Sequence, residues 1–243
     1  MNSNTIDKQD IVNAITDCRF KMYYQPIVKG DTKEVLKYEA LIRLVLPDGR
    51  TLPPNIFFPV AKELKRHRDI VFKVAFMVIE KLKENNNIKI AFNISHEDIE
   101  SALHRRVLLG MFRRNQDVIR DRLIVEIIET HKIKDIERTK EFSDELSKFG
   151  VMISLDDFGT EHSNLYLLSM INFDFLKIDG HFIQNINCEK TYTILNYIIN
   201  LCKELKIPII AEHIEDEKTF QHLMEIGVDY FQGFFFAKPR MNI

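Results

Sequence analysis

The sequence predicts an α/β fold, a modified eight-stranded (β/α)8 barrel of the TIM type. Short apolar runs alternate with longer amphipathic runs, which is typical of parallel strands joined by helices. The 243 residues match the roughly 250 that such a barrel needs. No Gly/Ser-rich or Pro-rich linker and no repeat divides the chain. We therefore expect a single barrel domain over residues 1–243, with a short polar lead at 1–10. A doubly wound open sheet is the alternative.

The first half of the chain begins with two apolar runs that no long helix separates, so we expect one strand to run antiparallel. Pro53 and Pro54 then begin a helical region, and Gly150 ends the last helix of this half, as glycine commonly does. The expected elements, in order, are strands at 20–28 and 35–44, helices from 53 to about 84, a strand at 89–95, helices to about 116, a strand at 123–129 and a helix at 136–149.

The second half alternates more regularly. Each expected strand is a short run of branched and aromatic residues, and each expected helix is a longer run with apolar residues at helical spacing. The expected strands are 151–156, 175–179, 208–213 and 229–232, and the expected helices are 189–206 and 216–226.

The composition excludes several functional classes. The net charge of -2 argues against a protein that binds a nucleic-acid polymer by neutralising many phosphates. The three cysteines are widely spaced, so we expect reduced thiols rather than disulfides or a zinc site. No apolar run approaches the roughly 20 residues of a membrane helix, and residues 1–10 lack a signal-peptide core. We therefore expect a cytoplasmic chain with no membrane segment.

Polar residues recur where the apolar strands end. In a barrel these ends meet at one face, where barrel enzymes place their sites. These residues are Glu39, Asn93, Glu126, Asp156, Asp157, Lys177, Glu212 and Gln232. Taken one at a time, each has a structural explanation. A charged residue at a strand end is usually a solvated cap, Glu126 could pair with Arg122, and Lys177 could extend its head group to solvent.

Repulsion among the acidic residues favours a shared metal site over separate solvated caps. Two like charges about 4 Å apart repel by roughly 4 kcal/mol at an effective dielectric near 20. Lys177 alone cannot neutralise five carboxylates at one barrel mouth. Carboxylate and amide oxygens suit Mg²⁺ or Mn²⁺, and two adjacent aspartates suit a pair of ions that cleaves a phosphoester.

A set of short motifs follows in order along the chain: Tyr24-Gln25-Pro26-Ile27-Val28, Glu39-Ala40-Leu41-Ile42-Arg43, Phe92-Asn93-Ile94-Ser95, Glu126-Ile127-Ile128-Glu129, Asp156-Asp157-Phe158-Gly159-Thr160, Leu176-Lys177-Ile178-Asp179, Ala211-Glu212, Gln232-Gly233 and Lys238-Pro239. In these motifs the chain resembles EAL domains, the cyclic-di-GMP phosphodiesterases. The resemblance runs from about Ile11 to Pro239, and the ordered set of motifs is more specific than any one of them.

The resemblance implies hydrolysis of cyclic-di-GMP to linear pGpG with two Mg²⁺ or Mn²⁺ ions, and it implies a homodimer. It also implies a role for each matching residue. The implied metal ligands are Glu39, Asn93, Glu126 and Asp156, with Asp157 on the second ion. Lys177 is implied to orient the attacking water, and Glu212 to be the general base or a ligand through water. The resemblance further implies that Arg43 binds a substrate phosphate, that Gln25 lines the pocket, that Gln232 is a further site residue and that Glu129 anchors the loop after Asp157.

The chain departs from the family pattern at three places. The loop after Thr160 has Glu161 where the family usually has glycine, which places a charge in the segment that links dimerisation to activity. Lys62 follows Ala61 where the family commonly has glutamate, and Glu63 would substitute only if the register shifted. His213 stands where a glycine usually follows Glu212. A histidine there invites a ligand interpretation, but a neighbouring strand position points away from the site.

These departures leave two further functions open. A degenerate cyclic-di-GMP receptor or protein-interaction module is the first, and the altered loop at Glu161 motivates it, although the acidic residues are retained. A barrel hydrolase for another phosphoester fits the site but not the ordered motifs. We favour the active phosphodiesterase, with activity reduced by the altered loop.

Overall fold

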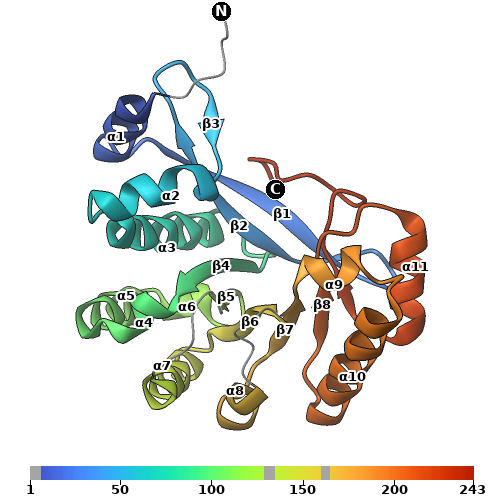
Figure 1. Ribbon diagram of the computed structural model, residues 1–243. Coiled ribbons are helices and arrows are strands. Elements are labelled where there is room, and N and C mark those ends of the chain that lie inside the picture. Colours follow the sequence, from blue (N-terminus) through green and yellow to red (C-terminus); the bar gives the residue numbers. More distant parts are fainter. Residues whose placement is uncertain (1–6, 129–134, 160–164) are drawn as a thin grey trace, which may run out of the picture.

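The chain forms a closed barrel in the computed structural model, which describes residues 7–128, 135–159 and 165–243 (Figure 1). In these residues one sheet has the strand order β1-β9-β8-β7-β6-β5-β4-β2-β3, and pairing of β1 with β2 closes it. The strands are β1 (Phe20–Lys29), β2 (Val35–Val45), β3 (Thr51–Leu52), β4 (Ile90–Ser95), β5 (Leu123–Ile128), β6 (Met152–Phe158), β7 (Phe175–Ile178), β8 (Ile209–Ala211) and β9 (Tyr230–Phe231). The predicted eight-stranded barrel is confirmed, and β3 only extends the edge of β2.

The predicted antiparallel strand is β1. It pairs antiparallel with both of its neighbours, β2 and β9, whereas the pairs from β2 and β4 round to β8 and β9 are parallel. A hairpin needs only a short turn, so β1 and β2 can follow each other without the helix that a parallel crossover requires. Gln25 and Glu39 are direct partners in this hairpin.

Helices surround the barrel (Figure 1). In the described part of the chain they are α1 (Lys8–Thr16), α2 (Pro54–Glu63), α3 (His67–Glu84), α4 (His96–Glu100), α5 (Ala102–Arg114), α6 (Gln116–Ile119), α7 (Ile136–Lys148), α8 (Leu165–Met170), α9 (Gly180–Gln184), α10 (Glu189–Leu205) and α11 (Glu217–Ile226). Their inner faces and the outer faces of the strands share one apolar core. No helix of the described residues is both long enough and apolar enough to cross a bilayer.

Capping residues explain several helix boundaries. The side chains of Asp135 and Asp216 accept hydrogen bonds from backbone N–H groups at the starts of α7 and α11, which satisfies donors that a helix leaves unpaired. Gly227 ends α11 with a positive φ of 95°, and Gly150 follows α7 at 72°. Glycine adopts this left-handed conformation without strain.

The prediction lacks helices α1, α8 and α9 and strand β3. Helix α1 begins at Lys8, within the stretch that we treated as a polar lead, because Asp7 caps it. Three apolar residues of α1, Ile11, Ala14 and Ile15, are buried. Strand β3 has only two residues, too few for apolar alternation to mark it in the sequence.

The barrel interior has two layers. An apolar layer consists of Ile27, Ala91, Ile124, Phe175 and Ile210, all buried. A polar layer lies directly above it, because successive inward-facing residues of a strand are two positions apart. Each apolar residue is therefore two positions from a polar one: Gln25, Asn93, Glu126, Lys177 and Glu212. The polar layer lies at the carboxyl ends of the parallel strands.

Candidate metal centre

Lys177 lies at the centre of the polar layer. Its ammonium nitrogen is 2.6 Å from Glu212 Oε1, 3.0 Å from Glu126 Oε2, 3.1 Å from Asp156 Oδ1 and 3.5 Å from Glu39 Oε2. Only 1% of the Lys177 side chain is exposed. The four carboxylates come from β2, β5, β6 and the residue after β8, so the barrel brings together groups up to 173 positions apart. The interpretation of Lys177 as a solvent-extended side chain is wrong.

Glu126 is held between two lysines. Lys177 donates to its Oε2, and Lys37 Nζ donates to its Oε1 at 3.2 Å, with neither partner of the second pair exposed. Arg122 donates instead to backbone carbonyls, including those of Ile88 and Leu82. The alternative pairing of Glu126 with Arg122 is therefore wrong.

Lys37 was not among the residues predicted for the site. This residue is two positions before Glu39 on β2, so both side chains face the barrel interior. That spacing was the available signal. Lys37 also lies 4.3 Å from the centre of the Phe175 ring, so a cation stands in the otherwise apolar layer.

Three amide side chains surround Glu39. Asn93 Nδ2 donates to Glu39 Oε1 at 2.9 Å, and Gln232 Nε2 donates to Glu39 Oε2 at 2.7 Å. Gln232 also donates to Gln25 Oε1 at 3.3 Å, and Gln25 donates to the Ala237 carbonyl at 3.1 Å. Glu39 is thereby fixed from both sides.

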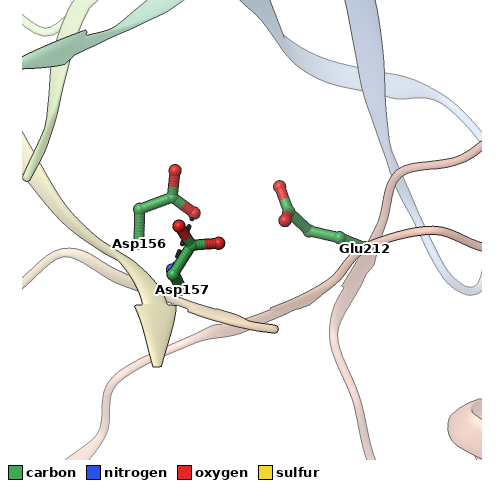
Figure 2. Close-up of side chains that lie close together, drawn as sticks. All are labelled: Asp156, Asp157 and Glu212. Carbon is green, nitrogen blue, oxygen red and sulfur yellow. Dashed lines mark hydrogen bonds between the residues drawn. The ribbon is translucent and has the colours of Figure 1, made fainter. Parts of the chain in front are cut away.

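Asp156, Asp157 and Glu212 form a group of potential ligands whose carboxylate oxygens lie within 4.8 Å of one another. Figure 2 shows the two aspartates side by side, with Glu212 facing them across the site. Consecutive strand residues normally point to opposite faces. Here Asp157 has a φ of 57°, and the β6–β7 register shifts between Leu155 and Phe158. Such a bulge redirects a side chain, so both aspartates reach the site.

Burial and charge shift the pKa values of this cluster in opposite directions. Burial raises the pKa of Asp156 well above its usual range and also raises those of Asp157 and Glu212. Burial also opposes ionisation of Glu126, but Lys177 and Lys37 outweigh it and lower the pKa of Glu126. Burial alone would lower the pKa of Lys177, but the surrounding carboxylates raise it well above its usual range. The lysine is therefore a fixed cation.

Two cavities open beside the cluster. One, of about 320 Å³, is lined by Gln25, Arg43, Lys177, Gln232 and other residues of the polar layer. The other, of about 760 Å³, is mostly apolar and lies between β2, α2, α3 and α4. Asn93 and Asp157 line its inner end. The site therefore has room for a ligand much larger than a metal ion.

The departure from the family pattern at Lys62 lies on α2, beside the larger cavity. Lys62 lines the larger cavity, and its Nζ is 3.5 Å from Glu97 Oε1. Glu63 pairs with Lys8 of α1 at 2.5 Å and is exposed, so the register does not shift to bring Glu63 into the cavity.

His213 is exposed and has a φ of 56°, the left-handed region that favours glycine. A Cβ added at Gly180 would lie 2.3 Å from its Nδ1, so the ring packs directly on the start of α9. His213 is not part of the carboxylate group. Glu129, Thr160 and Glu161 lie outside the described residues.

The donor set fits a divalent metal. All its potential ligands are oxygens, as hard cations prefer. Among the described residues, Asn93 Oδ1 and Gln232 Oε1 are buried and have no hydrogen-bond partner. A buried acceptor left unpaired costs about 1–3 kcal/mol. A cation or its bound water at this place would satisfy such an acceptor.

A family model described as "EAL domain" matches residues 8–239. The chain belongs to the EAL domain family. The predicted family is thus confirmed over nearly the whole chain, and the Glu39-Ala40-Leu41 triplet of this EAL domain lies on β2, in the wall of the site.

Named relatives and solved structures agree with this family assignment. This EAL domain is 32% identical over 238 residues to cyclic di-GMP phosphodiesterase PdeA of Borreliella burgdorferi, covering 95% of this chain and 35% of PdeA. It superposes on an EAL domain protein of Listeria monocytogenes with a TM-score of 0.86, 28% identity and coverage of 98% and 96%. For the PaMucR phosphodiesterase in complex with c-di-GMP, the TM-score is 0.84, with 27% identity and 96% of both chains covered. The chain spans about a third of the length of the first curated relatives it matches.

Proposed function

We propose that this EAL domain is a metal-dependent phosphodiesterase that hydrolyses cyclic-di-GMP to linear pGpG. The observation that carries the proposal is the buried cluster of carboxylates around Lys177, with unpaired amide oxygens beside it. The names of PdeA and PaMucR support the choice of reaction. The two adjoining cavities offer space for a dinucleotide.

Glu39, Asn93, Glu126 and Asp156 would hold a pair of Mg²⁺ or Mn²⁺ ions, with Asp157 on the second ion. Their oxygen chemistry supports this assignment. Bound divalent ions lower the pKa of water and supply hydroxide at neutral pH. The left-handed backbone at Asp157 supports a role for that side chain, because a regular strand would turn it away.

The remaining site residues would act on water and on the substrate. Lys177 holds a positive charge beside four carboxylates and orients the attacking water. Glu212, with its raised pKa, accepts a proton from that water or holds a ligand through it. Arg43 lines the smaller cavity and suits a phosphate group. Gln232 donates to Glu39 and to Gln25, and both glutamines line the smaller cavity, where they would contact the substrate. Glu129 would anchor the loop after Asp157.

The reaction consumes one water. The water oxygen bonds to phosphorus, the bond from phosphorus to the 3′ oxygen breaks, and that oxygen leaves as a hydroxyl after gaining a proton. The product keeps its 5′ phosphate, as the name pGpG requires. Charge developing on the phosphoryl oxygens would be offset by Arg43, by Lys177 and by divalent ions held at the site.

A hydrolysis assay tests this proposal. The purified chain is incubated with cyclic-di-GMP in Mg²⁺, Mn²⁺ or chelator, and pGpG is quantified by chromatography. We expect pGpG in both metals and none in chelator. Calorimetry with the same ligand separates the alternative function: tight binding with no pGpG in either metal would reject the enzyme and support a receptor.

Three further assignments belong to the proposal. The chain would act as one domain, in the cytoplasm, and as a homodimer. Light scattering at several protein concentrations tests the last of these, and a monomer at every concentration would reject it.

A further inference from the structure

Lys37 differs from the other residues of the site in its position. It lies in the apolar layer of the barrel, below the carboxylates, and none of its side chain is exposed to solvent. Its Nζ donates to Glu126 Oε1 at 3.2 Å and lies 4.3 Å from the centre of the Phe175 ring. Burial lowers the pKa of Lys37, and the charge of Glu126 opposes that shift. An ammonium group in such surroundings is costly unless it is paired, and Glu126 supplies the pairing.

This contact changes what Glu126 offers to a metal. Lys177 holds Glu126 Oε2 and Lys37 holds Oε1, so both oxygens of the carboxylate already have cationic partners. Lys177 also contacts three other carboxylates. Among the described residues, Lys37 forms an ion pair with Glu126, and it also interacts at longer range with the charges of Glu39 and Asp174. The charge of Lys37 therefore acts most directly on one proposed ligand, Glu126.

We propose that Lys37 is a built-in counter-cation that stabilises the metal-free site and weakens metal binding at Glu126. The proposal rests on the metal centre proposed above. Lys37 offsets repulsion among the carboxylates when no ion is bound, and it repels a divalent ion that approaches Glu126. It is a positioning residue, because it acts through Glu126 and touches neither substrate nor solvent.

Replacing Lys37 by methionine tests this inference, because methionine keeps most of the side-chain volume and removes the charge. Mn²⁺ affinity is measured by calorimetry without substrate, and thermal unfolding is measured in chelator and in saturating Mn²⁺. We expect the K37M variant to bind Mn²⁺ about tenfold more tightly. We also expect its melting temperature to fall in chelator and to fall much less in Mn²⁺, because tighter binding adds stability to the loaded form.

Three variants serve as controls. K37Q is also neutral but retains a hydrogen-bond donor, and it replaces K37M in both measurements if K37M does not fold. K37R keeps the charge, and we expect its Mn²⁺ affinity to stay within about threefold of the wild type. Lys73 also lies over a phenylalanine ring, that of Phe76 at 5.8 Å, but on α3 outside the barrel, and K73M should leave Mn²⁺ affinity unchanged.

Two results would overturn the inference. If K37M and K37Q bind Mn²⁺ no more tightly than the wild type and lose equal stability in chelator and in Mn²⁺, Lys37 only fills space in the core. If they bind Mn²⁺ more weakly, Lys37 prepares Glu126 for the metal instead of competing with it. A wild-type protein that binds no Mn²⁺ at all would instead reject the proposed metal centre, and this outcome is distinct from both.

Discussion

Removing the charge of Lys177 should destabilise the metal-free protein strongly. The Lys177→Met variant leaves four carboxylates without the ammonium group that lies within 3.5 Å of each of them. Removing one partner from a buried ion pair costs about 3–5 kcal/mol. In a chain of this size, 1 kcal/mol shifts the melting temperature by roughly 2–4 °C. We therefore expect the melting temperature in chelator to fall by about 6–20 °C.

Scanning calorimetry in chelator and in Mn²⁺ measures this effect. Divalent ions would replace part of the lost positive charge, so Mn²⁺ should restore more stability to K177M than to the wild type. Lys140→Met is the matched control, because Lys140 pairs with Asp144 at 2.8 Å but the two side chains are 39% and 58% exposed. Such a surface pair contributes about 1 kcal/mol or less. A K177M melting temperature within the range of the K140M control would refute our account of the cluster.

Three other predictions can be tested. Glu39→Ala or Asp156→Ala should abolish pGpG formation while circular dichroism still shows a folded barrel, and full activity in either variant would reject the assigned roles. The pKa values of Asp156, Asp157 and Glu212 are raised in the folded protein. The folded state therefore holds protons that the unfolded chain has already released above about pH 4. As a result, the stability of the metal-free protein should fall as the pH rises from about 4 through the raised pKa values. Mn²⁺ binding in that pH range should release protons, and calorimetric heats that are identical in buffers of different ionisation enthalpy would contradict this. From the sequence alone, Glu161→Gly should raise the turnover rate by restoring loop freedom and removing a charge, and an unchanged or lower rate would reject the idea.

Much of the barrel was predictable because each strand is a compact apolar run that a turn or a helix follows. The polar layer was predictable for the same reason, since every strand end carries a polar residue. Helix α1 was not predicted, because its start at Lys8 is polar and only its later residues are buried. Strand β3 was too short to produce a pattern.

Two features of the site depend on geometry that apolar patterns do not encode. Strand alternation predicts that one of the paired aspartates faces away, and only the left-handed backbone of Asp157 brings both to the centre. The role of Lys37 could not be predicted, because its partner Glu126 is far from it in the sequence. Its carboxylate is 89 positions away, and only closure of the barrel brings the two groups together.

The apolar layer below the site has a consequence for the proposed reaction. Ile27, Ala91, Ile124, Phe175 and Ile210 close the barrel interior beneath the carboxylates, so substrate, water and product would all use the mouth at the carboxyl ends of the strands. A linear product must then leave through the same opening that the next cyclic substrate enters. If the proposed reaction holds, product and substrate exclude each other, and the product should act as a competitive inhibitor.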